Sequence, residues 1–98
     1  MTKTVLVVDD DPTQRRLIQA VLEREGFAVA HAENGDAAIT RLQSGAPTDL
    51  ILLDLLLPDI SGLEVLAKLR ADPILRHVPV IMFSASQDPT ARIKAFRA

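Results

Sequence analysis

The chain contains no cysteine, no tryptophan and no tyrosine. Without cysteine it can form neither a disulfide framework nor a thiolate metal site. No apolar run approaches the roughly 20 residues that a membrane-spanning helix requires. The apolar run near the N-terminus, Thr4–Val8, is too short for a signal peptide and meets acidic residues at once. These absences predict a cytoplasmic chain with no membrane partner.

What the chain does contain is typical of a small globular protein. Its 98 residues are 48% hydrophobic and 24% charged, far from the composition of a disordered segment. The formal net charge is −2, with acidic and basic residues mixed along the chain, which argues against a nucleic-acid-binding surface. We find no internal repeat and no linker. The sequence therefore predicts one domain over residues 1–98, with no nucleic-acid partner of its own.

Short apolar runs alternate with stretches of helical periodicity along the whole chain. This alternation predicts parallel βαβ units, and so an α/β fold with a doubly wound parallel sheet and helices on both faces. The expected strands are Thr4–Val8, Phe27–Ala32, Asp49–Leu53 and Val80–Phe83. The expected helices begin at Pro12, at about Asp36, at about Leu63 and at Pro89, the last with Ile93 and Phe96 three residues apart.

The helix ends carry recognisable signals. Asp11 is an acidic N-cap before Pro12, Gln14 stands at the capping-box position, and Gly26 lies where a C-terminal cap belongs. Apolar residues recur at helical spacing at Leu17, Ile18, Val21 and Leu22 in the first helix, and we expect Leu63, Leu66 and Leu69 on the inner face of the third.

Polar side chains follow three of the expected strands. Asp9 and Asp10 come after the first strand, Asp54 after the third and Ser84 after the fourth. Ligands of open α/β sheets bind beyond the carboxyl ends of the strands, so these residues converge on one edge. Carboxylates that close repel one another unless a cation holds them. An oxygen-only ligand set favours a hard ion, and Mg²⁺ suits phosphate chemistry.

Each of these residues also has an ordinary structural interpretation. Asp11 is best explained as an N-cap, and on spacing alone capping or turn formation is the lesser alternative for Asp9 and Asp10. Ser84 taken alone is an unremarkable strand-end residue. Asp54 differs, because it lies within seven aliphatic residues, where burying an acid is costly. The convergence of all four favours a functional site.

Three motifs carry a resemblance to a known family: VLVVDDDP at Val5–Pro12, LILLDLLLPDISGLEVL at Leu50–Leu66, and VPVIMFSA at Val78–Ala85. In order and spacing the chain resembles the receiver domains of response regulators in two-component signalling. The resemblance implies a flavodoxin-like fold with strand order 2-1-3-4, and a signalling switch rather than an enzyme in the usual sense.

The resemblance also implies roles for individual residues. Asp54 would be phosphorylated by a partner histidine kinase or a phosphotransfer protein, with kinase specificity mainly on the first helix, Gln14–Glu25. Pro58 and Gly62 fit the family's loop, where we expect Gly62 to permit a backbone shape that other residues resist. The remaining site comprises Asp10 and Asp54 as direct Mg²⁺ ligands, Asp9 acting mostly through water, the backbone carbonyl of Leu56, the switch hydroxyl of Ser84 and the backbone N–H of Ala85.

The family pattern continues beyond Ala98 with a loop, a fifth strand and a fifth helix, and a lysine that pairs with the phosphoryl group lies in that part. Lys3, Lys68 and Lys94 do not occupy its position. We therefore expect the fourth strand to be an exposed sheet edge and one face of the first helix to be bare. This predicts a homodimer, formed through the exposed fourth strand or by swapped elements.

Three functions compete on these observations. The first is a phosphorylation-dependent switch that uses Asp54 and Mg²⁺. The second is a truncated receiver that acts as an interaction or oligomerisation module with impaired phosphorylation. The third is an aspartyl-phosphate hydrolase of the dehalogenase type, which the sequence disfavours because that family requires a second Asp two residues on, where this chain has Leu56.

Overall fold

The protein is a twisted sheet with helices on both faces. The computed structural model describes residues 2–83, together with the backbone of residues 96 and 97. Four parallel strands lie in the order β2-β1-β3-β4, as predicted, and a short β5 pairs antiparallel with β4. The strands are β1 (Thr4–Val8), β2 (Ala28–Ala32), β3 (Leu50–Asp54), β4 (Val80–Phe83) and β5 (Phe96–Arg97).

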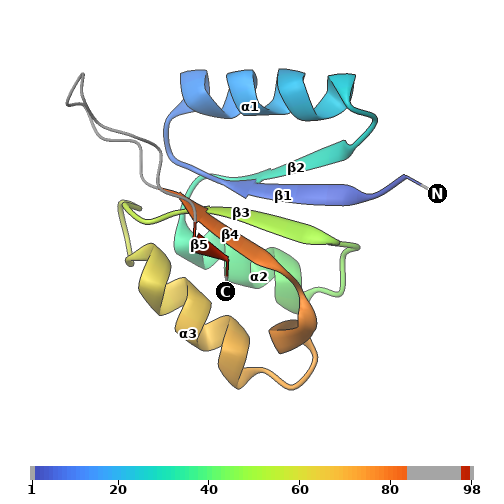
Figure 1. Ribbon diagram of the computed structural model, residues 1–98. Coiled ribbons are helices and arrows are strands. Elements are labelled where there is room, and N and C mark those ends of the chain that lie inside the picture. The colour runs from blue at the N-terminus through green and yellow to red at the C-terminus, as the bar shows by residue number, and fades with distance from the viewer. Residues whose placement is uncertain (1, 84–95, 98) are drawn as a thin grey trace.

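Three helices connect the parallel strands by crossovers. Figure 1 shows α1 over one face of the sheet, with α2 and α3 over the other. Their bounds are Pro12–Arg24 for α1, Gly35–Gln43 for α2 and Gly62–Ala71 for α3, and a short 3₁₀ helix, η1 (Leu75–His77), precedes β4. Within the described part of the chain, no helix has the length and apolar character needed to cross a membrane.

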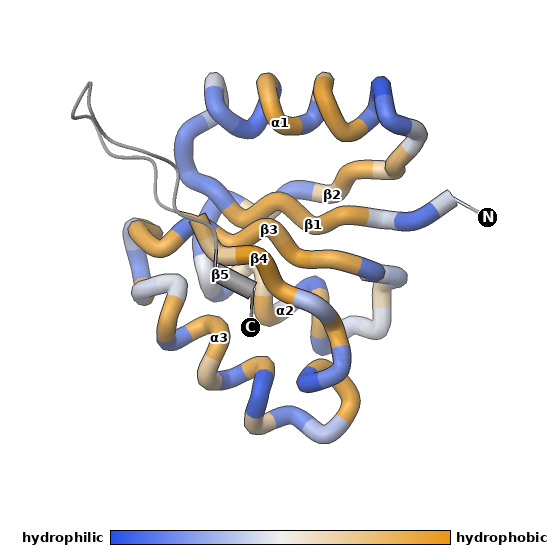
Figure 2. The backbone as a smooth tube through the Cα atoms, in the orientation of Figure 1, coloured by the Kyte–Doolittle hydropathy of each residue, from blue (hydrophilic) through white to orange (hydrophobic). Residues whose placement is uncertain are grey.

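The main core lies between the sheet and the α2–α3 layer. Alternate residues of the buried strands point to this side, and Figure 2 shows that β1, β3 and β4 are nearly continuously hydrophobic. Strands of a parallel sheet are covered on both faces, so they lack the polar alternation of a half-exposed strand. The buried members from these strands are Leu6, Val8, Ile51, Leu53, Val80 and Met82, and those from the helices are Ala38, Leu42, Val65 and Leu69.

The ends of α1 follow their sequence signals with one exception. The Asp11 carboxylate caps the helix by accepting the N–H groups of Thr13 at 2.9 Å and Gln14 at 3.4 Å. The capping box expected at Gln14 does not form, because the N–H of Asp11 donates instead to Asp9. Gly26, with φ 94°, closes the C-terminus in a Schellman arrangement.

Burial on the helices differs in part from the expected pattern. Leu63, expected on the inner face of α3, is 61% exposed, whereas Val65 and Leu69 are buried. Leu63 lies in the first turn of α3, directly after Gly62, which packs against the end of β3. This contact orients the helix so that Val65 and Leu69 face the core and Leu63 does not. On α1, Leu17 is 65% and Val21 58% exposed, which agrees with a bare helix face.

We expected β4 to be an unpaired edge of the sheet, and this is wrong for the residues of β4 that pair with β5. Ile81 pairs with Arg97 and Met82 with Phe96. The helix expected from Pro89 does not include Phe96, which belongs to this strand, and residues 84–95 lie outside the described residues. An antiparallel partner supplies hydrogen bonds that a free edge would leave to solvent.

Two leucines on helices provide a matched test of this packing. We expect Leu69→Ala to lower the free energy of unfolding by about 2–5 kcal/mol, because Leu69 is 1% exposed in the core. Leu17→Ala makes the same chemical change on an exposed face and should cost less than about 0.5 kcal/mol. Urea denaturation of dilute protein measures both. Equal losses would show that the outer face of α1 is covered.

Candidate functional site

Asp9, Asp10 and Asp54 meet at the carboxyl end of the sheet. Strands β1 and β3 are parallel neighbours, with Val8 opposite Leu53. Asp9, which follows β1, and Asp54, which ends β3, therefore lie side by side. One carboxylate oxygen from each of Asp9, Asp10 and Asp54 lies within 4.8 Å of the others. The convergence expected from the strand ends is confirmed for these acids, whereas Ser84 and Ala85 lie outside the described residues.

The two buried carboxylates are held by the backbone that follows them. Asp9 Oδ1 accepts the N–H of Asp11 at 3.0 Å, and Asp54 Oδ1 accepts the N–H of Leu56 at 3.0 Å. In both cases the side chain bonds two residues ahead, as in an Asx turn. Each side chain is thereby fixed through one oxygen. The other oxygen of Asp9, Oδ2, is buried without a partner in the described structure.

Burial makes the ionised cluster costly. Asp54 is 6% exposed, and burial raises its pKa to about 6, with repulsion from Asp9 and Asp10 adding to the rise and the Leu56 N–H opposing it. Burial also raises the pKa of Asp9, and the negative charges of Asp10 and Asp11 raise it further, against the bond from the Asp11 N–H. Both effects disfavour the charged forms of these acids.

A small, hard cation fits this arrangement. Asp9 Oδ2 is unpartnered, the three carboxylate oxygens lie within 4.8 Å of one another, and among the described residues the cluster has no nitrogen or sulfur ligand. These features describe an oxygen site of the kind that Mg²⁺ prefers. Such an ion would also offset the repulsion that raises the pKa of Asp54. The cluster is therefore consistent with Mg²⁺ binding.

The loop between β3 and α3, Leu55–Ser61, closes tightly beside Asp54. The N–H of Gly62 donates to the Leu55 carbonyl at 2.9 Å, and the N–H of Leu55 donates to Phe83 of β4 at 2.9 Å. A Cβ at Gly62 would overlap the backbone oxygen of Asp54. Gly62 does not have positive φ, so the expected reason for this glycine is wrong. Close approach of the backbone requires it instead.

Sequence reasoning missed two residues whose side chains make hydrogen bonds near the site. Arg15, in the first turns of α1, donates from Nη1 to the Asp9 carbonyl at 2.7 Å. Asp59 accepts backbone N–H groups from the start of α2. The DP-x-x-R spacing on α1 offered a weak signal for Arg15, since that spacing returns a long side chain to the helix start. Nothing in the sequence pairs Asp59 with α2.

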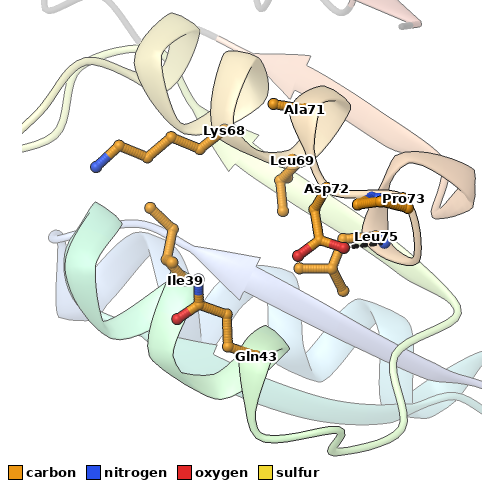
Figure 3. Close-up of a pocket in the computed structure, with 8 residues that line it drawn as sticks. All are labelled: Ile39, Gln43, Lys68, Leu69, Ala71, Asp72, Pro73 and Leu75. Carbon is orange, nitrogen blue, oxygen red and sulfur yellow. Dashed lines mark hydrogen bonds between the residues drawn. The ribbon is translucent and has the colours of Figure 1, made fainter.

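A cavity of about 440 Å³ lies away from the acids, between α2 and α3. Figure 3 shows its two charged side chains diverging, with the Lys68 ammonium directed away from Asp72. The Asp72 carboxylate is already engaged, since it accepts the N–H groups of Ile74 at 2.9 Å and Leu75 at 3.2 Å. The cavity therefore lacks the converging polar groups of a binding site.

A doubly wound sheet whose β1 and β3 ends bring three acids together defines a receiver-type α/β domain. Comparison with known proteins agrees. The sequence model of the response regulator receiver domain matches residues 5–98. The transcriptional regulatory protein ResD of Bacillus subtilis is 43% identical over 94 residues, which cover 96% of this chain and 38% of ResD. The response regulator MtrA of Mycolicibacterium smegmatis is 42% identical, over 90% of this chain and 37% of MtrA.

Solved structures give the same result. The response regulator TrrA of Thermotoga maritima, in complex with Mg²⁺-BeF, has a TM-score of 0.80 at 37% identity, over 88% of this chain and 72% of TrrA. The phosphorylated cyanobacterial regulator RcpA has a TM-score of 0.81 at 35% identity, over 90% of this chain and 69% of RcpA. The chain belongs to the response regulator receiver domains of two-component signal transduction. It spans less than half the length of ResD and MtrA.

The raised pKa of Asp54 predicts a pH-dependent stability. Between pH 3.8, which is the ordinary pKa of an Asp, and about pH 6, folded Asp54 keeps a proton that the unfolded chain releases. The metal-free protein therefore loses stability as pH rises through this window. We expect Asp54→Asn to raise the free energy of unfolding at pH 7.5 by about 1–3 kcal/mol, with little difference at pH 4.

Urea denaturation in the presence of a chelator measures both conditions. Asp36→Asn, which removes an exposed carboxylate outside the cluster, is the matched charge control. If Asp54→Asn were no more stable than the parent protein at pH 7.5, burial of the ionised Asp54 carboxylate would not destabilise the fold.

Proposed function

We propose that this chain is a cytoplasmic phosphorylation switch, and not an enzyme in its own right, which accepts a phosphoryl group on Asp54 from a histidine kinase or a phosphotransfer protein. One observation carries the proposal: Asp54 ends β3 as a buried carboxylate with Asp9 and Asp10 beside it. A carboxylate kept in such a site at this energetic cost is typical of a functional residue.

The cation in this proposal is Mg²⁺. Asp10 and Asp54 would hold it directly, Asp9 mostly through water, and the backbone carbonyl of Leu56 would complete the protein ligands. Bound Mg²⁺ supplies charge neutralisation at the acceptor carboxylate and orientation of the phosphoryl oxygens. The complex of Mg²⁺-BeF with TrrA, a relative of similar fold, supports this assignment.

The chain's own residues prepare Asp54 for the transfer. The Leu56 N–H fixes Oδ1, so the second oxygen is left to attack phosphorus. An O–P bond forms to this oxygen while the P–N bond to the donor histidine breaks, and the imidazole leaves with a proton from solvent. With a pKa near 6, Asp54 is mainly ionised at neutral pH and able to attack. Ser84 and the Ala85 N–H would then turn toward the phosphoryl oxygens.

Acetyl phosphate tests the acceptor directly. With Mg²⁺ present, we expect intact-mass measurement to show the gain of one phosphoryl group, lost in Asp54→Asn and in excess chelator. Asp49→Asn is the matched control, because Asp49 precedes the other end of β3, where it accepts the N–H of Thr4 at 2.8 Å. Modification that persists in Asp54→Asn would contradict the proposed acceptor.

A second candidate function, self-association as an interaction module, has its own supporting observation. Leu17 and Val21 are exposed on α1, and Leu52 and Ile81 are only half-buried on the sheet face that α1 covers at β1 and β2. Exposed apolar surface of this kind favours a protein partner. A second copy presents the same surface, and a contact between the two copies through it would be isologous.

Sedimentation velocity over a concentration series tests this candidate. We expect a weight-average mass that rises with concentration and falls back toward the monomer in Leu17→Lys/Val21→Lys. These exposed positions accept lysine without burying its charge, so folding should persist. A parent protein that remains monomeric at every concentration would exclude self-association.

A further inference from the structure

Asp59 joins the β3–α3 loop to a helix that is distant in sequence. Its Oδ1 accepts the N–H of Gly35 at 2.9 Å and its Oδ2 accepts the N–H of Asp36 at 2.9 Å. Both donors lie in the first turn of α2, where helix N–H groups lack partners within the helix. A single carboxylate from the loop therefore caps α2 with both oxygens.

Packing beside these bonds shows that the junction is closely fitted. Ile60 lies against Gly35 so tightly that a Cβ there would come within 2.5 Å of Ile60 Cγ1 and 2.8 Å of Val65 Cγ2. Asn34, the N-cap of α2, takes the next N–H, that of Ala37, at 2.7 Å. The first three N–H groups of α2 are thus satisfied, two of them by Asp59. These bonds also lower the pKa of the Asp59 carboxyl, so it stays charged at neutral pH.

The junction lies close in sequence to the proposed acceptor site. The loop is fixed at its two ends, where Leu55 bonds Phe83 and Gly62 bonds Leu55. Asp59 fixes it a third time. Residues Leu56–Pro58 lie between the fixed points at Leu55 and Asp59. Leu56 is exposed, and its N–H donates to the Asp54 carboxylate. Without Asp59, this part of the loop would lose its hydrogen bonds to α2 and keep only the packing of Leu57 and Ile60 against the core.

We propose that Asp59 is a positioning residue for the acceptor site, which holds the Leu56 backbone in place by fastening the loop to α2. The inference rests on the proposed function, since it concerns how the same site binds Mg²⁺ and accepts a phosphoryl group. Asp59 acts through the loop and touches neither the cation nor the phosphoryl group. Loss of a group that orients metal ligands typically weakens metal affinity by roughly 10–100-fold.

A Mg²⁺ titration of the full chain, followed by backbone amide NMR shifts, tests this role. We expect Asp59→Ala to weaken Mg²⁺ binding about tenfold and to slow phosphorylation by acetyl phosphate at limiting Mg²⁺, with the rate recovering in excess Mg²⁺. Asp59→Asn, which keeps one acceptor oxygen, should be intermediate. Amide hydrogen exchange of Gly35 and Asp36 should rise in Asp59→Ala, while the core of β1 and β3 stays protected.

Asp36→Ala is the matched control. It removes a negative charge from the same junction but keeps the bonds to Asp59, because Asp36 contributes only its backbone N–H. We expect near-parental Mg²⁺ affinity. Equal weakening by Asp36→Ala would mean that charge, not position, is responsible, and unchanged affinity in Asp59→Ala would overturn the inference outright. If the parent protein bound no Mg²⁺, the proposed function would fail and this inference with it.

Discussion

Repulsion among closely placed carboxylates is the constraint around which this molecule is built. Asp9 and Asp54 are both buried, and with Asp10 they lie within 4.8 Å of one another. Burial and repulsion raise the pKa of both buried acids. A fold maintains such an arrangement only if the surrounding structure leaves the acids no way to separate. Two parallel strands, paired in register up to the acids themselves, meet that requirement.

The rest of the fold keeps these strand ends fixed. The main core lies on the α2–α3 side of the sheet and clamps β1 and β3 along their length. Short polar contacts then set the last residues: the Arg15 guanidinium on the Asp9 carbonyl, and the Leu56 N–H on the Asp54 carboxylate. The core and the polar contacts have different effects, because hydrophobic burial has no direction whereas hydrogen bonds orient individual atoms. The core sets the position of the site, and the polar contacts set its geometry.

Periodicity and strand-end logic were sufficient to predict the doubly wound parallel sheet and the meeting of the three acids, since both follow from local patterns and parallel topology, whereas the strand order followed from the family resemblance. Some failures are local, such as the capping box at Gln14, which the bond from the Asp11 N–H to Asp9 replaces. Others come from contacts between different elements of the fold. Leu63 has helical spacing for the core, but the close packing of Gly62 on Asp54 turns it outward. The edge of β4 is partly covered by β5, whose antiparallel return has no local signal. The hydrogen bond between Asp59 and Gly35 joins residues 24 positions apart, and no sequence pattern indicates it.

The exposed face of α1 connects the two proposed functions. Leu17 and Val21 leave apolar surface in water, at a cost of roughly 25 cal/mol for each Å². The family resemblance places recognition of the kinase mainly on this same helix, over the segment Gln14–Glu25. A second copy of the chain and a phosphodonor would therefore compete for one surface. Self-association through α1 would then lower the rate of phosphoryl transfer from a protein donor but leave transfer from acetyl phosphate unchanged, because a small donor needs no docking face.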